Sequence, residues 1–252
     1  MTQDRMTSLF FEIFNENLPR QGPGDTASTL RALSLVPDLG PEARVLDVGC
    51  GTGPHTLLLA QQLPARIVAV DNHAPYVDAL NQRARDLGIA DRLDVRVGDM
   101  RHLDVEPGSF NLIWSEGAIY LMGFEAGLRE WHRLLAPGGH IAVTEVCWTK
   151  PDPPRDCAKF WAQEYPAMRD VGTLLGVIEE CGLNIVGHFT LPPSAWWDDF
   201  YRPLQGNVIR FRERHRHEPD AQTVADQVQR EIDIWQTYSE FYSYEFFVMR
   251  AR

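Results

Sequence analysis

The sequence contains a glycine-rich stretch, VLDVGCGTGPHT at residues 45–56, with an aspartate directly ahead of the glycines. Glycine loops that follow a strand often bind phosphate, because backbone N–H groups at a helix N-terminus attract anions. The carboxylate of Asp47 would instead repel a pyrophosphate and attract a cation, such as an ammonium group. The loop therefore predicts a ligand other than a dinucleotide. The loop residues that we expect at this ligand are Gly49, Cys50, Gly51, Thr52 and Gly53.

Acidic residues also follow the next two predicted strands. Asp71 lies 24 positions (71 − 47) after Asp47, close to the offset of about 20 at which an acid reaches ribose hydroxyls. Asp99 can accept a hydrogen bond from an adenine amine, and Met100 can supply an apolar face to the base. Ribose, adenine and a cationic amino-acid end together describe S-adenosylmethionine, which we predict as the cofactor. Asn72 and Ser115 end neighbouring strands and are further candidate contacts.

The elements that must position these residues follow a regular alternation from residue 44 onward. Short β-branched runs are followed by helix-like stretches, as in stacked βαβ units. A right-handed, mostly parallel and doubly wound sheet is expected. The predicted strands are 44–48, 66–70, 93–97, 110–114 and 140–146, and the predicted helices are 56–63, 74–87 and 123–135. Gly88 and the Pro137-Gly138-Gly139 turn are expected to end two of these helices.

The pattern changes after residue 148. KPDPPR at residues 150–155 cannot continue a strand or a helix. Aromatic residues concentrate at 160–165 and 196–201, and they indicate either the core of added helices or the lining of a pocket for a hydrophobic or cationic substrate. Beyond the break we predict helices at 156–165, 171–181 and 221–238 and strands at 184–191 and 244–250. The pattern predicts a helical insertion at about 150–182, and a substrate cover at about 192–217 is expected because folds of this class usually add one in this region.

The first 40 residues are predicted to form a separate helical segment ahead of a domain at 41–252. Residues 8–17 carry apolar side chains near one helical face, and LPRQGPGD then breaks the helix. Asp25 can cap a second helix at 26–35. This segment is either a cap over a sheet edge or a lid whose loop contacts the ligand.

Composition limits the classes of partner. Lys plus Arg is 24 against 35 for Asp plus Glu, so the formal net charge is −11. This charge opposes sequence-independent binding to nucleic acids or anionic membranes, and it favours a small-molecule substrate. The start lacks the features of a signal peptide, and no run of 18 apolar residues exists, so a cytoplasmic location is expected. The four cysteines lack metal-ligand spacing and are expected to be free thiols, and no metal is predicted.

Four stretches in order, VLDVGCGTG, AVDN, GDM and RLLAPGGHIAVTE, resemble the class I S-adenosylmethionine-dependent methyltransferases across about residues 42–146. The resemblance implies a Rossmann-like, mostly parallel seven-stranded sheet whose last strand is antiparallel. It also implies methyl transfer to a small molecule.

LPRQGPGD together with WSEGAIYLMGFEAGLREW is similar to a group of bacterial small-molecule methyltransferases in which an N-terminal segment folds over the cofactor. That likeness implies that Arg20, Gln21 and Gly22 approach the methionine portion. A cation at Arg20 suits the methionine carboxylate. A simple ion pair between Arg20 and a surface acid is the structural alternative.

A catalytic base is optional in an in-line displacement at a sulfonium carbon, because the leaving group is already activated. Glu116, Tyr120 and His55 are the candidate catalytic residues by position. Each has a structural alternative: a hydrogen bond at a strand end or a cofactor contact for Glu116, packing under the lid for Tyr120, and a helix start for His55. Rival functions are a non-catalytic S-adenosylmethionine sensor and an NAD-dependent oxidoreductase, and GCGTGP departs from the G-x-G-x-x-G fingerprint of the latter. A homodimer is compatible with the sequence.

Overall fold

The computed structural model describes residues 2–252, which form an α/β fold around one mixed sheet. Seven strands follow each other across the sheet in the order β3-β2-β1-β4-β5-β8-β7, and a two-residue strand, β6, pairs with β5 at the side. β8 is antiparallel to both of its neighbours, and the other strands of the path are parallel. The predicted doubly wound sheet and its antiparallel last strand are confirmed. The strands are β1 (Arg44–Val48), β2 (Arg66–Asp71), β3 (Leu93–Val97), β4 (Phe110–Ser115), β5 (Leu135–Trp148), β6 (Arg169–Asp170), β7 (Leu183–Thr190) and β8 (Tyr242–Ala251).

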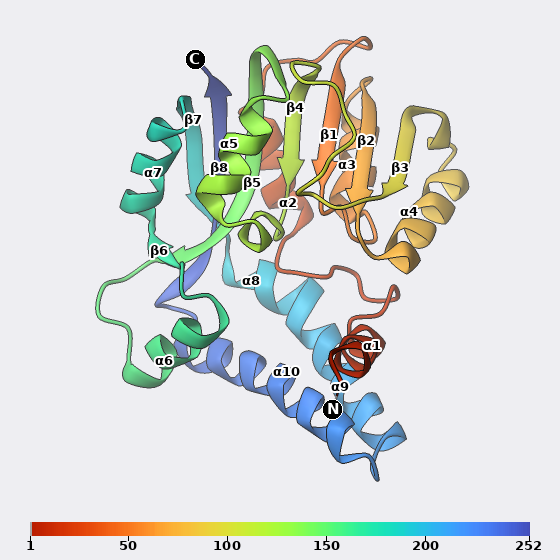
Figure 1. The fold of residues 1–252 in the computed structure, drawn as a ribbon, viewed down its shortest axis with the longest axis vertical. Helices are drawn as coiled ribbons and strands as arrows, with labels where there is room; N and C mark the ends of the chain where they lie inside the picture. Colours follow the sequence, from red (N-terminus) through yellow and green to blue (C-terminus); the bar gives the residue numbers. More distant parts are fainter. Residues whose placement is uncertain (1) are drawn as a thin grey trace.

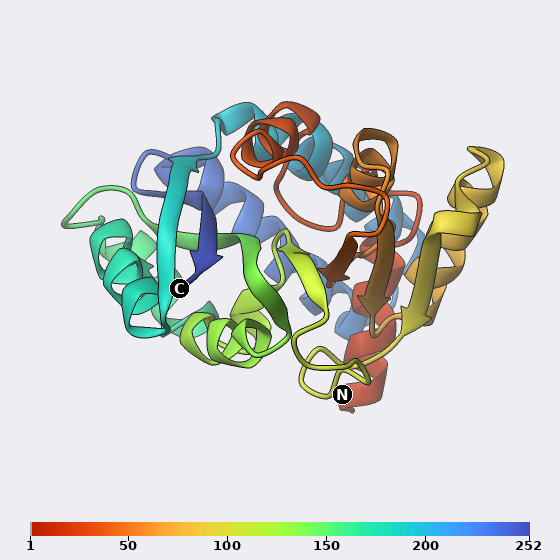
Figure 2. The same cartoon turned by 90° about the horizontal axis from the view of Figure 1, so that it is seen from above.

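Helices cover both faces of this sheet (Figures 1 and 2). The central strands are buried on both sides, which explains their nearly continuous apolar sequences. Among the covering helices, α3 packs on β2, α5 on β5 and α7 on β7. The helices are α1 (Gln3–Ile13), α2 (Thr26–Leu33), α3 (Pro54–Gln62), α4 (Ala74–Asp86), α5 (Phe124–His132), α6 (Arg155–Glu164), α7 (Val171–Glu180), α8 (Pro193–Trp196), α9 (Arg202–Arg214) and α10 (Pro219–Tyr238), with short turns η1 (Ala90–Arg92), η2 (Ile119–Leu121) and η3 (Trp197–Tyr201).

Most predicted elements begin and end within two residues of the observed ones, but three do not. The first helix spans residues 3–13 rather than 8–17, because the Thr2 side chain caps it by accepting from the Arg5 backbone N–H. The helix at 123–135 ends at His132. β5 already begins at Leu135, so Pro137-Gly138-Gly139 lies inside this strand where a turn was expected. The register between β4 and β5 shifts there, between the Phe110–Leu135 and Leu112–His140 pairs. Gly138 permits this irregularity because it adopts a φ of 74°.

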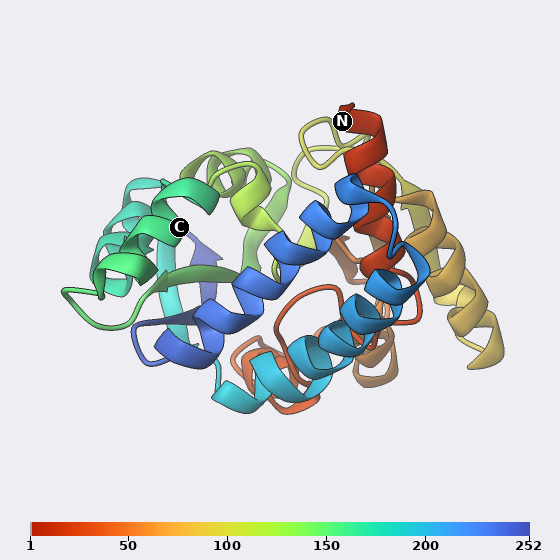
Figure 3. The same ribbon diagram turned by 90° about the horizontal axis from the view of Figure 1, so that it is seen from below.

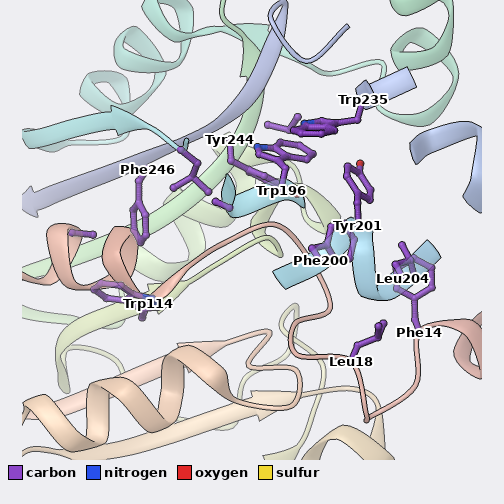
Figure 4. Close-up of a cluster of buried hydrophobic side chains, with 14 of the residues drawn as sticks. Phe14, Leu18, Trp114, Trp196, Phe200, Tyr201, Leu204, Trp235, Tyr244 and Phe246 are labelled. Carbon is purple, nitrogen blue, oxygen red and sulfur yellow. The ribbon is translucent and has the colours of Figure 1, made fainter. Parts of the chain in front are cut away.

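A helical layer lies beyond the carboxyl ends of the parallel strands. Figure 1 shows α1, α6, α9 and α10 gathered at this end of the sheet, and Figure 3 shows α10 crossing beneath it beside α1 and α9. For α9 the sequence indicated only a solvated helix face at residues 210–217, without the earlier part of the helix. A buried aromatic cluster joins the layer to the sheet, with Trp196 stacked between Trp235 and Tyr244 at ring distances of 6.2 and 5.1 Å (Figure 4). The strand ends are therefore enclosed. No helix between Thr2 and Arg252 is long and apolar enough to cross a membrane.

Candidate functional site

A cavity of about 370 Å³ opens at the carboxyl ends of β1, β2 and β4, below the N-terminal segment. Twelve of the residues predicted from the sequence line it. They come from five separate stretches of the chain, so the fold does bring them together. These residues are Arg20, Gln21, Gly22, Gly49, Cys50, Gly51, His55, Asp71, Asn72, Met100, Glu116 and Tyr120.

The backbone N–H groups of the glycine loop are already hydrogen-bonded within the protein. Those of Gly49 and Cys50 both donate to the carbonyl of Val70, at 2.8 and 3.1 Å. The N–H of Gly51 donates to the Asp71 carboxylate at 2.8 Å. The next two donate to the Gln21 side chain and to the Cys50 carbonyl. Because a phosphate site needs free N–H groups, this loop is not built as one.

The glycines serve close packing instead. A Cβ on Gly49 would lie 2.4 Å from the Ala118 Cβ, and one on Gly53 would lie 2.1 Å from a Leu80 methyl group. Both glycines also have positive φ angles, which side-chain-bearing residues rarely adopt. The loop therefore brings bare backbone to the cavity wall, with Gly49 at the surface of the cavity and Gly53 behind it.

Asp71 lies where the spacing predicted, in the cavity wall at the end of β2. Its two carboxylate oxygens accept from the N–H groups of Gly51 and His73, at 2.8 and 2.9 Å. Burial raises the pKa of Asp71 above its ordinary value, although these two hydrogen bonds oppose the shift. The lone pairs that remain on each oxygen face a site where hydroxyl groups can donate.

Asp47 does not line the cavity, and this corrects the expected contact with an ammonium group. Its carboxylate is fully buried and accepts from the Thr56 hydroxyl at 2.5 Å, and the His55 ring Nε2 lies 3.2 Å from its other oxygen. Asp47 therefore supports the helix start behind the cavity.

Four further predicted contacts also lie outside the cavity. Asp99 is exposed and accepts from the Arg101 backbone N–H at 2.9 Å, and its contact with the base stays a prediction. Ser115 is buried and donates to the Val48 carbonyl at 2.8 Å, joining β4 to β1. Thr52 donates to the Gln21 side chain at 2.8 Å, and Gly53 packs against Leu80.

Glu116 and Arg20 form a buried ion pair at the cavity wall. Their side chains are 4% and 7% exposed and their charged atoms lie 3.0 Å apart. Glu116 also accepts from the Thr29 hydroxyl at 2.8 Å and from the Trp114 indole at 3.0 Å. Burial acts to raise the pKa of Glu116, but the charges of His55 and Arg20 outweigh it and leave that pKa lowered. The geometry thus favours the structural role for Glu116, which anchors the N-terminal segment over the cavity.

His55 has a similar environment. Burial acts to lower its pKa, but the carboxylates of Asp47 and Glu116 outweigh this effect and raise it. The shift favours the protonated ring, which cannot accept a further proton. His55 is therefore poorly suited to act as a base.

Aromatic residues that the sequence analysis did not assign to the site form the far wall of this cavity. Phe11 of α1 stacks on the His73 ring at 3.7 Å, and Tyr76 lies edge-on to His73 at 4.4 Å. Phe10 and Phe14 complete this wall. The apolar face of the first helix was visible in the sequence, but its position over His73 depends on the fold.

Tyr120 lines this cavity and also a second one of about 170 Å³. Its side chain is partly exposed, and burial of its phenol, followed by the charges of Glu231 and Glu145, raises its pKa to about 12. The phenol therefore stays protonated at neutral pH. Within residues 2–252 all four cysteines are buried and unpaired, and no group of three acidic, histidine or cysteine side chains is arranged for a metal.

Comparisons with known proteins agree with this architecture. The family model described as "Methyltransferase domain" matches residues 45–139. Methyltransferase GfsG of Streptomyces halstedii is 31% identical over 110 residues, which are 43% of this chain and 40% of that protein. Demethylmenaquinone methyltransferase of Lactiplantibacillus plantarum is 33% identical over 119 residues, which are 46% of this chain and 49% of that protein. The chain thus spans less than half the length of these relatives.

Among solved structures, a SAM-dependent methyltransferase from Geobacter sulfurreducens in complex with S-adenosyl-L-homocysteine is similar over 98% of both chains. The TM-score is 0.82 and the sequence identity is 22%. This likeness shows the fold over nearly the whole chain, while the family match covers the glycine loop and the strand ends. Residues 45–139 thus match the methyltransferase domain, and the whole chain is similar in fold to a SAM-dependent methyltransferase.

Proposed function

We propose that the protein binds S-adenosylmethionine in the larger cavity and transfers its methyl group to a small molecule. The observation that carries this proposal is the glycine loop, whose N–H groups are all used inside the protein while its backbone still lines the cavity. Such a loop suits a nucleoside without phosphate. The family match and the cofactor product bound in the Geobacter sulfurreducens protein support the same cofactor here.

The residues of the wall fit the parts of this cofactor. Asp71 is placed to accept from the ribose hydroxyls, and Met100 offers an apolar surface to the adenine. Arg20 donates one Nη to Glu116, and its guanidinium has further N–H groups for the methionine carboxylate. Phe11, stacked on His73, covers the cavity from the N-terminal side. We propose that residues 1–40 act as the lid over the cofactor.

The cofactor supplies a methyl group that is already activated by the sulfonium charge. The protein then has to align the acceptor with that methyl group and to exclude water. The lowered pKa of Glu116 makes its carboxylate a weak base, the raised pKa of His55 favours its protonated ring, and the raised pKa of Tyr120 keeps its phenol protonated at neutral pH. We infer catalysis by positioning, with Tyr120 as the residue between cofactor and acceptor.

A non-catalytic sensor and an NAD-dependent oxidoreductase fit less well. A sensor needs no acceptor site, whereas Tyr120 joins the first cavity to a second one that can hold an acceptor. An oxidoreductase needs a pyrophosphate site, and the occupied N–H groups of the loop do not offer one. A cytoplasmic location and homodimer formation stay predictions of the sequence.

A methyl-transfer assay tests the proposal. Purified protein is incubated with methyl-labelled S-adenosylmethionine and fractionated small molecules from a cell extract. We expect label to appear in a small molecule and S-adenosylhomocysteine to accumulate. Tight binding of S-adenosylmethionine without any transfer across all fractions would instead identify a sensor.

A further inference from the structure

The second cavity lies between the sheet and the helical layer, next to the proposed cofactor site. Its wall combines residues from β5, β8, η2, α6 and α10, and α6 and α10 contact each other on its outer side (Figures 1 and 3). Tyr120 lines both cavities, so its side chain separates a molecule in the second cavity from one in the first. The lining residues are Tyr120, Val146, Phe160, Trp161, Glu164, Tyr165, Glu231 and Tyr244.

Within residues 2–252, the wall of this cavity contains acidic side chains and no basic ones. Glu164 and Glu231 are its two ionisable acids, and none of the described residues that line it is Lys, Arg or His. A carboxylate or phosphate on a ligand would be repelled by these groups in a partly desolvated space, whereas a cation would be attracted. The lining therefore favours positively charged ligands over negatively charged ones.

A third carboxylate, Glu145, lies directly behind the wall. Its Oε1 accepts from the Tyr165 hydroxyl at 2.7 Å, and its Oε2 is buried without a hydrogen-bond partner within residues 2–252. The residue is 1% exposed. An unpartnered buried carboxyl oxygen costs free energy, and a cation in the adjacent cavity would lower the cost of ionising this group.

Burial also affects the charge state of these acids. It raises the pKa of Glu145 to about 8, against the hydrogen bond from Tyr165, and it raises the pKa of Glu231, against the hydrogen bond from Tyr201. Both carboxyl groups therefore ionise more readily when a positive ligand is nearby.

Aromatic rings supply the rest of the wall. Tyr120 meets Tyr165 edge-on at 5.9 Å, and Phe160 meets Trp161 edge-on at 5.3 Å. The guanidinium of Arg230 already lies 5.7 Å from the centre of the Phe160 ring, so the aromatic surface open to a ligand comes from the other rings of the wall. Aromatic faces next to carboxylates are the usual surroundings of bound ammonium groups.

Resting on the proposed function, we propose that the second cavity is the methyl-acceptor pocket and that it selects a small molecule carrying an amine or ammonium group. The acids Glu231 and Glu164 attract the positive nitrogen, and Tyr165, Trp161 and Tyr244 enclose it. Acceptors that carry phosphate or carboxylate at this position are excluded.

Calorimetry on protein saturated with S-adenosylhomocysteine tests this selection. The preceding titration with S-adenosylhomocysteine alone reports on the proposed cofactor site, so a failure there is recognised separately. The probes are phenethylamine, its uncharged analogue 2-phenylethanol and the anion phenylacetate. We expect the amine to bind about tenfold more tightly than the alcohol, as for one charge-assisted hydrogen bond, and phenylacetate to bind most weakly.

Substitutions then show which side chains cause the preference for the amine. Glu231→Gln preserves the acceptor for the Tyr201 hydroxyl and should remove most of the preference for the amine, while affinity for the alcohol stays the same. Glu164→Gln, at an exposed position of the wall, should reduce the preference without risk to folding. Glu125→Gln, in an exposed ion pair with Arg129 on α5, is the control and should leave it intact. An amine that binds no better than the alcohol or does not bind, or a preference that survives Glu231→Gln, overturns the proposal.

Discussion

The carboxylate of Glu116 lies 3.0 Å from the guanidinium of Arg20, 96 positions away in the sequence, and both side chains are almost completely buried. This contact joins the end of β4 to the segment that follows α1. It therefore couples the cover of the proposed cofactor site to the sheet.

Glu116→Gln should destabilise the protein, because it leaves the charge of Arg20 buried without its partner. Loss of one member of a buried ion pair costs about 3 to 5 kcal/mol. Urea unfolding at neutral pH measures this. Glu125→Gln breaks the exposed pair with Arg129 and should cost at most about 0.5 kcal/mol. Equal effects of the two substitutions would contradict the anchoring role of Glu116.

The pH dependence of stability should reveal the buried carboxyl group of Glu145. Its pKa is raised to about 8 by burial. Below the ordinary pKa of glutamate both the folded and the unfolded chain hold the proton, and between that value and about 8 only the folded chain holds it. The contribution of Glu145 to stability is therefore present at low pH and lost as the pH rises through this window.

Glu145→Gln removes this dependence. Between about pH 5 and pH 7.5, the free energy of unfolding of the unchanged protein should fall relative to that of Glu145→Gln by up to about 1.4 kcal/mol per pH unit. Urea unfolding of both proteins across this range is the measurement. Curves that stay parallel would show that Glu145 is ionised in the folded protein.

Gly49→Ala should weaken both the fold and cofactor binding. The new Cβ would lie 2.4 Å from that of Ala118 at a residue with a φ of 76°. Overpacking of this kind costs about 1 to 3 kcal/mol, and the left-handed backbone adds about 1 to 2 kcal/mol. Gly40→Ala is the matched control, since nothing lies within 4 Å of its Cβ position. Equal melting temperatures of the two variants would contradict the close approach of Gly49 to Ala118.

Asp71→Ala should weaken binding of S-adenosylmethionine by about 1 to 3 kcal/mol, the usual cost of a lost hydrogen bond to a charged group. Asp71→Ala also frees the Gly51 N–H, so circular dichroism should accompany the titration. Asp99→Ala should leave the affinity unchanged, because Asp99 is exposed and lies outside the cavity. A larger loss with Asp99→Ala would restore the contact with adenine that the sequence suggested.

Local sequence patterns were sufficient to predict the sheet and part of the site. The spacing from Asp47 to Asp71 follows from one βαβ unit, so it predicted that Asp71 would lie in the cavity wall. The same reasoning did not place Asp99 among the residues that line the cavity, because the end of a strand places a residue at the edge of the sheet without deciding which way the following loop turns it. Asp47 failed for another reason: its carboxylate accepts from the Thr56 hydroxyl, nine positions along the chain in the first turn of α3.

Contacts between distant segments were beyond prediction from one sequence. The structural alternative for Arg20 was an unspecified surface acid, whereas the fold pairs it with the buried Glu116. The second cavity combines Tyr120, Tyr165, Glu231 and Tyr244 from four separate elements, and no spacing rule connects them. The aromatic clusters could be recognised in the sequence, but their division between core and cavity wall required the packing of α6 and α10.

The central claim is that the loop at residues 49–53 accommodates a nucleoside without phosphate. Calorimetry with S-adenosylmethionine and with NAD tests it most directly. We predict binding of S-adenosylmethionine in the micromolar range and no measurable binding of NAD, because the N–H groups of the loop are already occupied. Micromolar binding of NAD without binding of S-adenosylmethionine would contradict the account.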